Sequence, residues 1–376
     1  MLQADVLIIG AGIVGAACAR EFARRGLSVA VVEQSAPGGG ATAASMGHLL
    51  VVDAEGASDD HEYRLSRRSM QLWGQWLAES GEHEHVSEFQ RCGTLWLAAD
   101  DEEWQLAQRK ACWLQSQGMN AELLDAQALR QLEPLLHHRL VGALRVPADG
   151  RVYPPKVVQR WLDESRATLI RGEVRDLRPG RVRLQDGRLF SAAMVVLCGG
   201  LASQRFLPAG SLLPKKGQLA ITQAREQRLR HQLVELGYIK KAHLVDEDTV
   251  SFNVQPRPAG QWLIGSSRQI GREDREIDLP MLRRMLTCAA DYLPSLPQQS
   301  LLRCWSGIRP ASADGQPLIG AHPTLRNTWV ACGHEGLGIT TSLASAELVA
   351  DLSLAQPAGL DARPYDPARF CIALPA

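Results

Sequence analysis

The sequence lacks a charge excess of either sign and lacks a long apolar run. Lys+Arg and Asp+Glu both number 41, so the formal net charge is zero, and neither nucleic acid nor an anionic membrane is favoured as a partner. The first apolar run, within Val6–Ile9, is too short to cross a bilayer and follows no basic segment. We therefore expect no signal sequence and no transmembrane segment.

Paired cysteines and compact metal-binding motifs are also absent. No C-x-x-C occurs among the eight cysteines, which makes zinc or iron–sulfur ligation by this chain unlikely on chemical grounds. Most of them lie in apolar runs and are expected to be reduced core residues of a cytoplasmic protein. "EHEH" (Glu82–His85) and the pair His137, His138 lack the spacing of a helical metal site, so we predict no metal. No G-x-S-x-G supports hydrolysis.

What the sequence does contain begins five residues from its start. "DVLIIG" is a continuous apolar run, as expected for a strand buried on both faces of a parallel sheet. Gly10, Gly12 and Gly15 then form G-x-G-x-x-G, followed by a predicted helix, Ile13–Arg25, that ends at Gly26. The amides at the start of this helix are expected to hold a pyrophosphate.

A second apolar strand, "LSVAVVE", ends in Glu33. A carboxylate in this position accepts hydrogen bonds from an adenosine ribose and opposes a 2′-phosphate. Strand, glycines, helix, strand and acid in this order predict a dinucleotide site. They disfavour NADP and leave NAD and FAD open.

Three later stretches favour FAD. "GGGATAASMGHL" (Gly38–Leu49) is a loop of small residues, which suits a backbone lying along an extended ligand. "AAMVVLCGGLAS" (Ala192–Ser203) is another buried strand ending in a Gly-Gly turn, preceded by a hairpin-like segment, Val174–Phe190. "NTWVACGHEGLGITTSLASAELVADL" repeats strand, glycine turn and helix near the end of the chain.

Together with "DGRVYPPKVVQRWL", "PKKGQL", "WSGIRPASADGQPLIG" and "YDPARF", these stretches resemble the FAD-dependent D-amino-acid oxidase and glycine oxidase family. The resemblance covers nearly the whole chain. It implies an α/β fold: a Rossmann-type, glutathione-reductase-like FAD-binding domain with an inserted antiparallel-sheet substrate domain. We expect residues 1–50, 140–210 and 300–376 in the FAD-binding domain, and 51–139 and 211–299 in the substrate-binding domain.

Within the two insertions, the apolar patterns predict several helices and strands. Helices are expected near Glu62–Glu79, Asp101–Gln117, Asp125–Leu132 and Met281–Leu293, and strands at "GTLWLAA", "GQLAITQ", "TVSFNVQP" and "QWLIGSS". Trp73, Trp76, Leu77, Trp104 and Trp113 have helix-compatible spacings and are expected to be core residues rather than cofactor contacts.

Arg309 is the predicted catalytic and substrate-binding residue, because the family places a carboxylate-binding arginine at this point of the motif. A guanidinium offers two parallel donors to a carboxylate, which Lys does not. The structural alternative is an ion pair with Asp314, five residues on.

His48, at the end of the small-residue loop, is the second candidate catalytic residue. Its imidazole would face either the isoalloxazine or the substrate, or else serve a purely structural role. Phe252 and Asn253 are expected in the substrate pocket, although strand alternation lets only one of them face inward.

The glycine turn Gly333–Thr340 should place a helix N-terminus near the pyrimidine end of the flavin, where its dipole favours developing negative charge. The roles of His334 and Glu335 stay open. The resemblance implies a cofactor-binding set of Gly10, Gly12, Ile13, Val14, Gly15, Glu33, Gln34, Thr42, Ala43, Ser45, Met46, Gly47, His48, Val174, Cys198, Gly199, Gly200, Gly307, Arg309, His334, Glu335, Gly336, Leu337, Gly338, Ile339 and Thr340. No Cys occurs in "GIRPASAD", so FAD is expected to be non-covalent.

The resemblance implies oxidation of the Cα–N bond of a small amino or imino acid by hydride transfer to flavin N5. "FQRCGTLWLAADDEEW" and the last glycine turn are most similar to the flavin subunits of heteromeric D-hydroxyproline dehydrogenase and opine oxidase. This similarity implies partner subunits that receive the electrons, through a second flavin (FMN) or an iron–sulfur cluster at the interface. A stand-alone glycine, sarcosine or D-amino-acid oxidase using oxygen, a non-catalytic flavin relay subunit and an NAD-dependent dehydrogenase are the alternatives.

Overall fold

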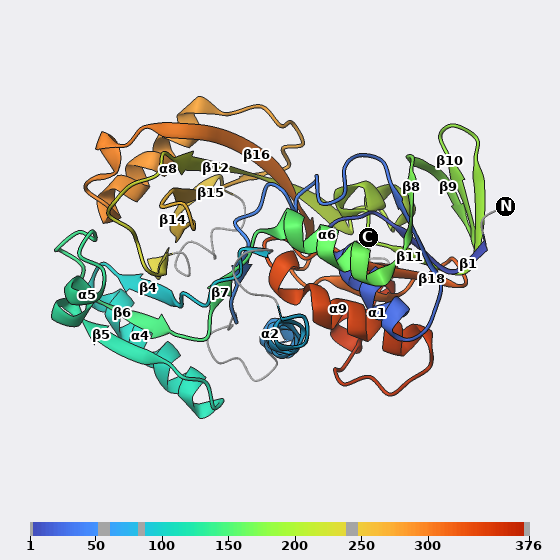
Figure 1. Cartoon of the computed structure of the whole chain (residues 1–376), viewed down its shortest axis with the longest axis horizontal. Helices are drawn as coiled ribbons and strands as arrows, with labels where there is room; N and C mark the ends of the chain where they lie inside the picture. The colour runs from blue at the N-terminus through green and yellow to red at the C-terminus, as the bar shows by residue number, and fades with distance from the viewer. Residues whose placement is uncertain (1–2, 52–60, 82–86, 238–246, 372–376) are drawn as a thin grey trace, which may run out of the picture.

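The computed structural model describes residues 3–51, 61–81, 87–237 and 247–371. Its elements gather into two groups that lie side by side along the long axis, each built on an eight-stranded sheet (Figure 1). A third, two-stranded sheet joins β3 (His48–Leu49) to β7 (Gly150–Arg151).

The first sheet has the strand order β17-β18-β11-β1-β2-β8. Its strands are β1 (Gln3–Ile9), β2 (Val29–Glu33), β8 (Thr168–Arg171), β11 (Leu189–Leu197), β17 (Leu318–Ala321) and β18 (Thr328–Cys332). All neighbours on this path pair in parallel except β17 with β18. A hairpin of β9 (Val174–Arg178) and β10 (Arg181–Leu184) extends from β11. The parallel order agrees with the predicted Rossmann-type fold.

Helices cover one face of this sheet: α1 (Ile13–Arg24), α2 (His61–Glu79), α6 (Pro154–Ser165) and α9 (Gly338–Ser353) (Figure 1). Val6 and Ile8 of β1 pack on this side, whereas Leu7 and Ile9 belong to the cluster on the opposite face. Both faces of β1 are therefore buried, which explains its uninterrupted apolar sequence. The 3₁₀ helix η1 (Gly200–Phe206) contributes to the second cluster.

The second sheet has the order β16-β12-β15-β14-β13-β4-β6-β5. Its strands are β4 (Thr94–Ala98), β5 (Glu122–Asp125), β6 (Gly142–Val146), β12 (Leu212–Thr222), β13 (Gln232–Glu235), β14 (Thr249–Pro256), β15 (Trp262–Ile270) and β16 (Leu301–Ser312). The pairs are antiparallel, as predicted, except that β13 runs parallel to β4.

Helices pack on both faces of this second sheet. α8 (Leu279–Tyr292) and α5 (Ala126–Leu132) belong to the cluster on one face, and α4 (Asp101–Ser116) packs on β4 and β6 from the other. Asp278 caps α8 by accepting from the Met281 amide at 3.0 Å. Short 3₁₀ helices complete the described chain: η2 (Leu296–Gln298), η3 (Arg363–Tyr365) and η4 (Pro367–Phe370).

Three elements lie on the other side of the domain boundaries expected from sequence. β6 and β16 fall in ranges expected in the FAD-binding domain but belong to the second sheet. α2, expected in the substrate domain, packs against α9 beside the first sheet. Its Trp73 and Trp76 stack with Trp161 of α6 at centroid distances of 4.9 and 5.4 Å. They are core residues, as predicted, but of the first group of elements.

The structure also bears on the expectations for the cysteines and for membrane-spanning segments. Of the cysteines, Cys18, Cys198 and Cys332 are buried, whereas Cys112 and Cys371 are exposed, so the expectation of core cysteines was too general. All eight are free thiols. None of the helices in the described part of the chain combines the length and apolar character that a membrane span needs.

Candidate active site

The turn between β1 and α1 can be built only with glycine at two positions. Gly10 has a φ of +102°, and a Cβ there would lie 2.6 Å from the Cys198 carbonyl oxygen. A Cβ at Gly15 would lie 2.0 Å from the Gly10 carbonyl oxygen. The absence of a side chain at Gly10 lets β11 come close to the turn. The absence of a side chain at Gly15 lets α1 pack against the turn. Both support the predicted nucleotide-binding geometry.

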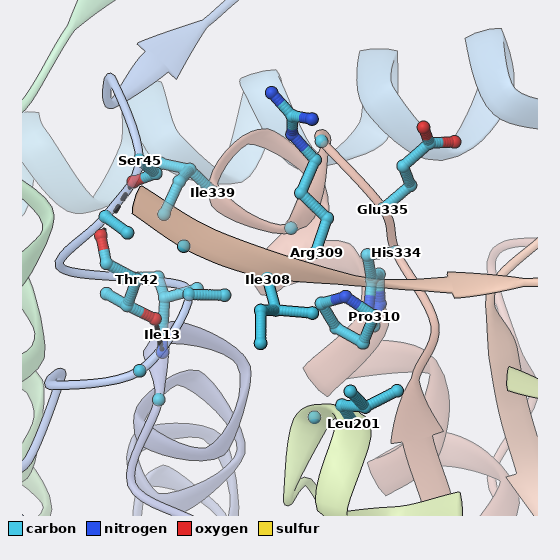
Figure 2. Close-up of a pocket in the computed structure, with 18 of the residues that line it drawn as sticks. Ile13, Thr42, Ser45, Leu201, Ile308, Arg309, Pro310, His334, Glu335 and Ile339 are labelled. Atoms are coloured by element: carbon cyan, nitrogen blue, oxygen red, sulfur yellow. Dashed lines mark hydrogen bonds between the residues drawn. The ribbon is translucent and has the colours of Figure 1, made fainter. Parts of the chain in front are cut away.

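Side chains from the next two segments hold this turn in place. Glu33 Oε2 accepts from the Ala11 amide at 2.8 Å, and Thr42 Oγ1 accepts from the Ile13 amide at 3.0 Å (Figure 2). The Ile13 amide is thus used within the protein. The next amides of the first helical turn, those of Val14 and Gly15, have no partner inside the helix.

The small-residue loop packs directly on the strand that carries Arg309. A Cβ at Gly307 would lie 2.2 Å from the Ala44 Cβ, so the loop can approach β16 only over a glycine. Gly47 has a φ of +85°, and a Cβ there would lie 2.2 Å from the Val152 carbonyl oxygen. The neighbouring Ala43, predicted to contact the cofactor, is instead exposed and lies outside the cavity lining, which includes Ala44.

Arg309 lies on β16 in the lining of the cavity, and its side chain lies on the opposite side of the strand from Ile308 (Figure 2). The guanidinium extends over Gly217 of β12, and Nη1 donates to the Ser267 carbonyl at 3.1 Å. Asp314 does not pair with Arg309, because Arg369 binds both Asp314 oxygens, at 2.6 and 3.0 Å. The alternative interpretation, in which Arg309 forms an ion pair with Asp314, is therefore wrong.

His48 lines the same cavity and is fixed by a glutamine network. Gln232 donates to the Gly150 carbonyl at 2.8 Å, which turns its Oε1 toward His48 Nδ1 at 2.5 Å. In this assignment Nδ1 carries the proton and Nε2 carries a lone pair. Nε2 is buried and makes no hydrogen bond of normal geometry to a described residue. Burial lowers the pKa of His48, and hydrogen bonding to Gln232 and to Asn253 opposes this more weakly.

β14 presents Asn253 to the cavity and Phe252 to the opposite face of the sheet. The Phe252 ring is fully buried and stacks on Tyr292 of α8, with centroids 4.2 Å apart. Phe252 therefore borders the cavity while α8 holds its ring on the opposite face, and Asn253 is the one of the two residues that faces inward. Asn253 Oδ1 is buried without a hydrogen-bond partner among the described residues.

The last glycine turn leads from β18 into α9. Gly333 has a φ of +79°, and Glu335 adopts +47°, which is uncommon for a residue with a side chain. The Glu335 amide donates to the Pro310 carbonyl at 2.9 Å, so the turn is tied to β16. His334 is buried, and its Nε2 lies 2.9 Å from Ser345 Oγ within α9. Burial lowers the pKa of His334 to about 4, so we describe it as a structural, neutral side chain.

One cavity of about 970 Å³ joins these parts. With two exceptions, Ala43 and Gly15, every residue of the predicted cofactor set lines it. Gly15 does not line the cavity, but its lack of a side chain lets α1 pack against Gly10. The cavity runs from the glycine turn past Val174 and the small-residue loop to Arg309, Asn253 and the turn at residues 333–340. The room for a dinucleotide that extends from Gly10 to Arg309, on which the sequence prediction depends, is therefore present.

Sequence reasoning missed several residues of the cavity wall. Lys215 and Gly217 lie in the quoted motif "PKKGQL" but were not predicted as site residues, and Arg268 was not predicted at all. Lys215 Nζ lies 3.2 Å from Glu335 Oε2, and Arg268 Nε lies 3.9 Å from Glu335 Oε1. Strand alternation indicates that Lys215 and Gly217 face the same side of one strand. The sequence gives no sign that this strand pairs with the strand that carries Arg309.

No group of three potential metal ligands occurs among the residues that the structure describes. His137 and His138 stack on each other, with centroids 4.4 Å apart, and "EHEH" lies outside the described residues. The chain's own donors instead suit FAD: a glycine cradle that a Cβ would fill, helix-end amides, and Glu33 for a ribose.

Comparison with known proteins agrees with this assignment. Residues 5–352 match the DAO family, described as FAD dependent oxidoreductase. The chain is 28% identical to glycine oxidase of Geobacillus kaustophilus over 96% of each chain. It is 27% identical to hydrogen cyanide synthase subunit HcnC of Pseudomonas aeruginosa, over 97% of this chain and 96% of HcnC.

Solved structures show the same relationship. The crystal structure of the Geobacillus kaustophilus glycine oxidase superposes with a TM-score of 0.86 at 27% identity, covering 98% of this chain and 99% of that one. L-Proline dehydrogenase from P. horikoshii, at 23% identity, has a TM-score of 0.82 and shares the fold over 98% of both chains.

Proposed function

The chain belongs to the DAO family of FAD-dependent oxidoreductases, and on that premise we propose that it acts on amino acids and oxidises the Cα–N bond of a small amino or imino acid. Three polar groups in one cavity carry the proposal: the Arg309 guanidinium, His48 Nε2 and Asn253 Oδ1. One is a cation and the other two are acceptors. This set is complementary to the carboxylate and the amine of an amino acid.

Arg309 binds the substrate carboxylate. Its guanidinium is held by the Ser267 carbonyl and by the absence of a side chain at Gly217, so its orientation is set before the substrate arrives. Two parallel N–H donors fix the plane of a carboxylate and hence the direction of the Cα–H bond.

His48 and Asn253 bind the amine. A neutral imidazole with its proton on Nδ1 offers Nε2 as an acceptor, and its lowered pKa keeps it neutral near pH 7. His48 interacts with Asn253, but neither His48 Nε2 nor Asn253 Oδ1 has a hydrogen bond of normal geometry to a described residue. A ligand that carries N–H groups would satisfy both acceptors. The amine must be in its neutral form before reaction, because its lone pair forms the C=N bond. His48 Nε2 accepts a hydrogen bond from that amine and so orients the lone pair.

The cofactor and the protein divide the remaining work. FAD, when bound, supplies the acceptor for the hydride equivalent that leaves Cα. The residues of 333–340 bring the start of α9 to the cavity, where helix-end amides favour negative charge. Thr340 ties this helix to His48 by donating to the His48 carbonyl at 3.0 Å.

The first substrate to test is cis-4-hydroxy-D-proline, because the motifs quoted above resemble those of D-hydroxyproline dehydrogenase flavin subunits. Asn253 is suited to a ring hydroxyl as well as to an amine. Opines and other secondary amino acids come next, followed by glycine and sarcosine. If the substrate is D-hydroxyproline or an opine, we expect the flavin to pass its electrons to a partner subunit. One relative, HcnC, is itself described as a subunit.

The decisive experiment is an anaerobic titration of the yellow, FAD-loaded protein with D- and N-alkyl amino acids, followed by visible absorption. The expected result is bleaching by at least one amino acid. Failure with every amino acid favours a non-catalytic relay subunit, and a colourless protein that binds no flavin contradicts the whole assignment. Arg309→Ala should keep FAD and lose carboxylate affinity, whereas unchanged kinetics would contradict the role of Arg309. Arg309→Lys, which keeps the charge without the paired donors, is the matched variant.

The electron acceptor is tested separately by the peroxide yield of the isolated chain under air. Little peroxide, together with rapid reduction of an artificial dye, is expected if a partner subunit receives the electrons. Abundant peroxide at normal turnover would instead identify a stand-alone oxidase.

A further inference from the structure

Two buried glutamines connect His48 to an arginine that lies outside the cavity lining. Arg257, the residue after β14, donates from Nη1 to Gln255 Oε1 at 2.9 Å. Gln255 Nε2 donates to Gln232 Oε1 at 2.9 Å, and the same oxygen lies 2.5 Å from His48 Nδ1. Both glutamines are fully buried, and Arg257 is 9% exposed. Because Arg257 does not line the cavity, it can affect a bound substrate only through other residues.

The groups at the two ends of this chain set the direction of every hydrogen bond in it. A guanidinium only donates and a backbone carbonyl only accepts. Arg257 therefore turns the oxygen of Gln255 toward itself and the nitrogen toward Gln232. At the other end Gln232 Nε2 donates to the Gly150 carbonyl at 2.8 Å, which turns its oxygen toward Gln255 and His48. The two ends agree on both amide orientations.

These orientations decide where the proton of His48 lies. Gln232 Oε1 accepts in this chain, so the nearby Nδ1 of His48 carries the proton. Gln255 Nε2 lies further from Nδ1, at 3.3 Å. In the other tautomer the Nδ1 lone pair would face the Gln232 oxygen, and a proton on Nε2 would stop this nitrogen from accepting a hydrogen bond from an amine.

Glu88 is the counterion of Arg257. Its Oε2 accepts from Arg257 Nη2 at 2.5 Å, and its side chain is 25% exposed. Burial lowers the pKa of His48 most, and the positive charge of Arg257 lowers it further. Removing Arg257 would therefore withdraw a positive charge and leave the negative charge of Glu88, and both changes favour a protonated imidazole.

We propose that Arg257 is a positioning residue for the amine site: through Gln255 and Gln232 it holds His48 with its proton on Nδ1 and with Nε2 ready to accept. This inference rests on the proposed function, in which His48 binds the substrate amine. It extends that function to a residue that touches neither the substrate nor the cofactor.

Other ionisable groups surround His48 and have to stay constant in a test that uses pH. Asp149, directly before β7, is hydrogen-bonded to Thr94, and burial raises its pKa to about 7. It is present in every protein compared below, so its contribution cancels. The other groups on the surrounding elements and the cavity wall include Arg151 on β7, Glu235 on β13, Glu347 on α9, Glu62 on α2 and Lys110 on α4.

The first measurement reads the tautomer directly, in FAD-loaded protein with isotope-labelled histidine. Protonated and unprotonated ring nitrogens of a neutral imidazole have well-separated nitrogen chemical shifts, and the signals lost in His48→Gln identify those of His48. The expected result at neutral pH is a protonated Nδ1 and an unprotonated Nε2. A protonated Nε2 in the native protein would overturn the inference whatever the activity of the enzyme.

Arg257→Met should move the acid limb of the kcat/KM profile to higher pH. The substitution frees Gln255 to turn its oxygen toward His48, and it removes the positive charge, so His48 is protonated more readily. We expect this variant to lose at least about threefold more of its kcat/KM at pH 6 than at pH 8. Arg257→Lys keeps a charged group that only donates, and should restore most of the native profile.

Two further variants separate this effect from a general loss of structure. Glu88→Gln removes the counterion and should move the acid limb to lower pH, opposite to Arg257→Met, whereas a structural disturbance would move both alike. Arg20→Met is the matched control, because Arg20 is also 9% exposed, lies outside the cavity lining, and pairs with Glu164 at 2.6 Å. It should keep the native pH profile.

The outcomes separate this inference from the proposed function. A native acid limb in Arg257→Met, an equal shift in Arg257→Lys, or shifts of the same direction in Arg257→Met and Glu88→Gln would each overturn the role of Arg257. The contacts of His48 and Arg309 with the substrate would then still stand. If the nitrogen shifts of His48 respond to Arg257→Met as expected while kcat/KM does not, Arg257 holds His48 but the proposed binding of the amine by His48 is wrong.

Discussion

The guanidinium of Arg309 occupies the space that a side chain at Gly217 would fill: a Cβ built on Gly217 would lie 2.6 Å from Arg309 Nη2 and 2.8 Å from Cζ. The two residues lie on neighbouring strands, with Gly217 opposite Gly307 and Arg309 two residues further along β16. The position of the proposed carboxylate-binding group is thus decided by an absent side chain on the adjacent strand.

Gly217→Ala should therefore displace the Arg309 guanidinium, although Arg309 itself is not substituted. We expect KM for an amino acid substrate to rise by about tenfold or more, the loss typical of a misplaced charge-assisted contact, with FAD content unchanged. Steady-state kinetics and the ratio of flavin to protein absorbance measure both quantities. Gly359→Ala, where a Cβ meets nothing within 4 Å, is the control. A Gly217→Ala enzyme with the native KM would contradict the claim that the missing side chain at Gly217 sets the position of Arg309.

Gly15→Ala should abolish FAD binding. A methyl group at this position would lie 2.0 Å from the Gly10 carbonyl oxygen, so α1 must move away from the turn and carry its first-turn amides with it. The purified variant should be colourless but folded, as circular dichroism would verify. Gly74→Ala makes the same substitution in the interior of α2 with nothing within 4 Å, and should stay yellow. A yellow Gly15→Ala protein would refute the proposed position of the cofactor.

His48→Gln should change the acid limb of the pH–rate profile. Burial lowers the pKa of His48, so in the native enzyme kcat/KM should fall as the pH drops through this lowered value and Nε2 becomes protonated. The glutamine variant should lose that ionisation and react roughly 10²-fold more slowly at neutral pH. The matched measurement is kcat/KM against pH for both proteins with one substrate. An identical acid limb in the two proteins would contradict the role of His48 as an acceptor.

His334 should make the folded state less stable in acid. Burial lowers its pKa to about 4, against about 6.5 in an unfolded chain. Between these values the unfolded chain binds a proton that the folded protein does not, so the free energy of unfolding falls as the pH is lowered from 6.5 to 4, by about 3 kcal/mol in total. Urea unfolding of the native protein and of His334→Gln measures the difference.

The comparison with His334→Gln is needed because Asp149 acts in the opposite direction. Burial raises the pKa of Asp149 to about 7, so the folded protein binds a proton there between pH 7 and 3.8 and gains stability as the pH falls. Asp149 contributes equally to both proteins and cancels in the difference. A constant difference from pH 7 to pH 4 would contradict a buried, neutral His334.

Local sequence was sufficient for the parts of this protein that depend on short-range geometry. The continuous apolar run of β1, the glycines after it, the helix ending before Gly26 and the terminal Glu33 all follow from residues a few positions apart. The structure confirms each of these elements. The same holds for α4, α5 and α8, whose apolar spacing and capping residues are local signals.

The composition of the site depended on pairings across the chain. Asp314 is close to Arg309 in sequence but binds Arg369, and Arg309 binds the Ser267 carbonyl on β15. Strand alternation predicted that one of Phe252 and Asn253 faces the cavity, but α8 decided which, by covering the Phe252 face. Lys215, Arg268 and Glu335 meet only because β12, β15 and the turn before α9 converge.

By itself, the sequence determined the strand, glycine turn, helix and terminal acid that suit a dinucleotide, because these features act within one βαβ unit. Only the tertiary structure decided which charges surround the substrate. Side chains from β12, β14, β15 and β16 are brought together by sheet register and helix cover, and these depend on contacts between residues far apart in the chain.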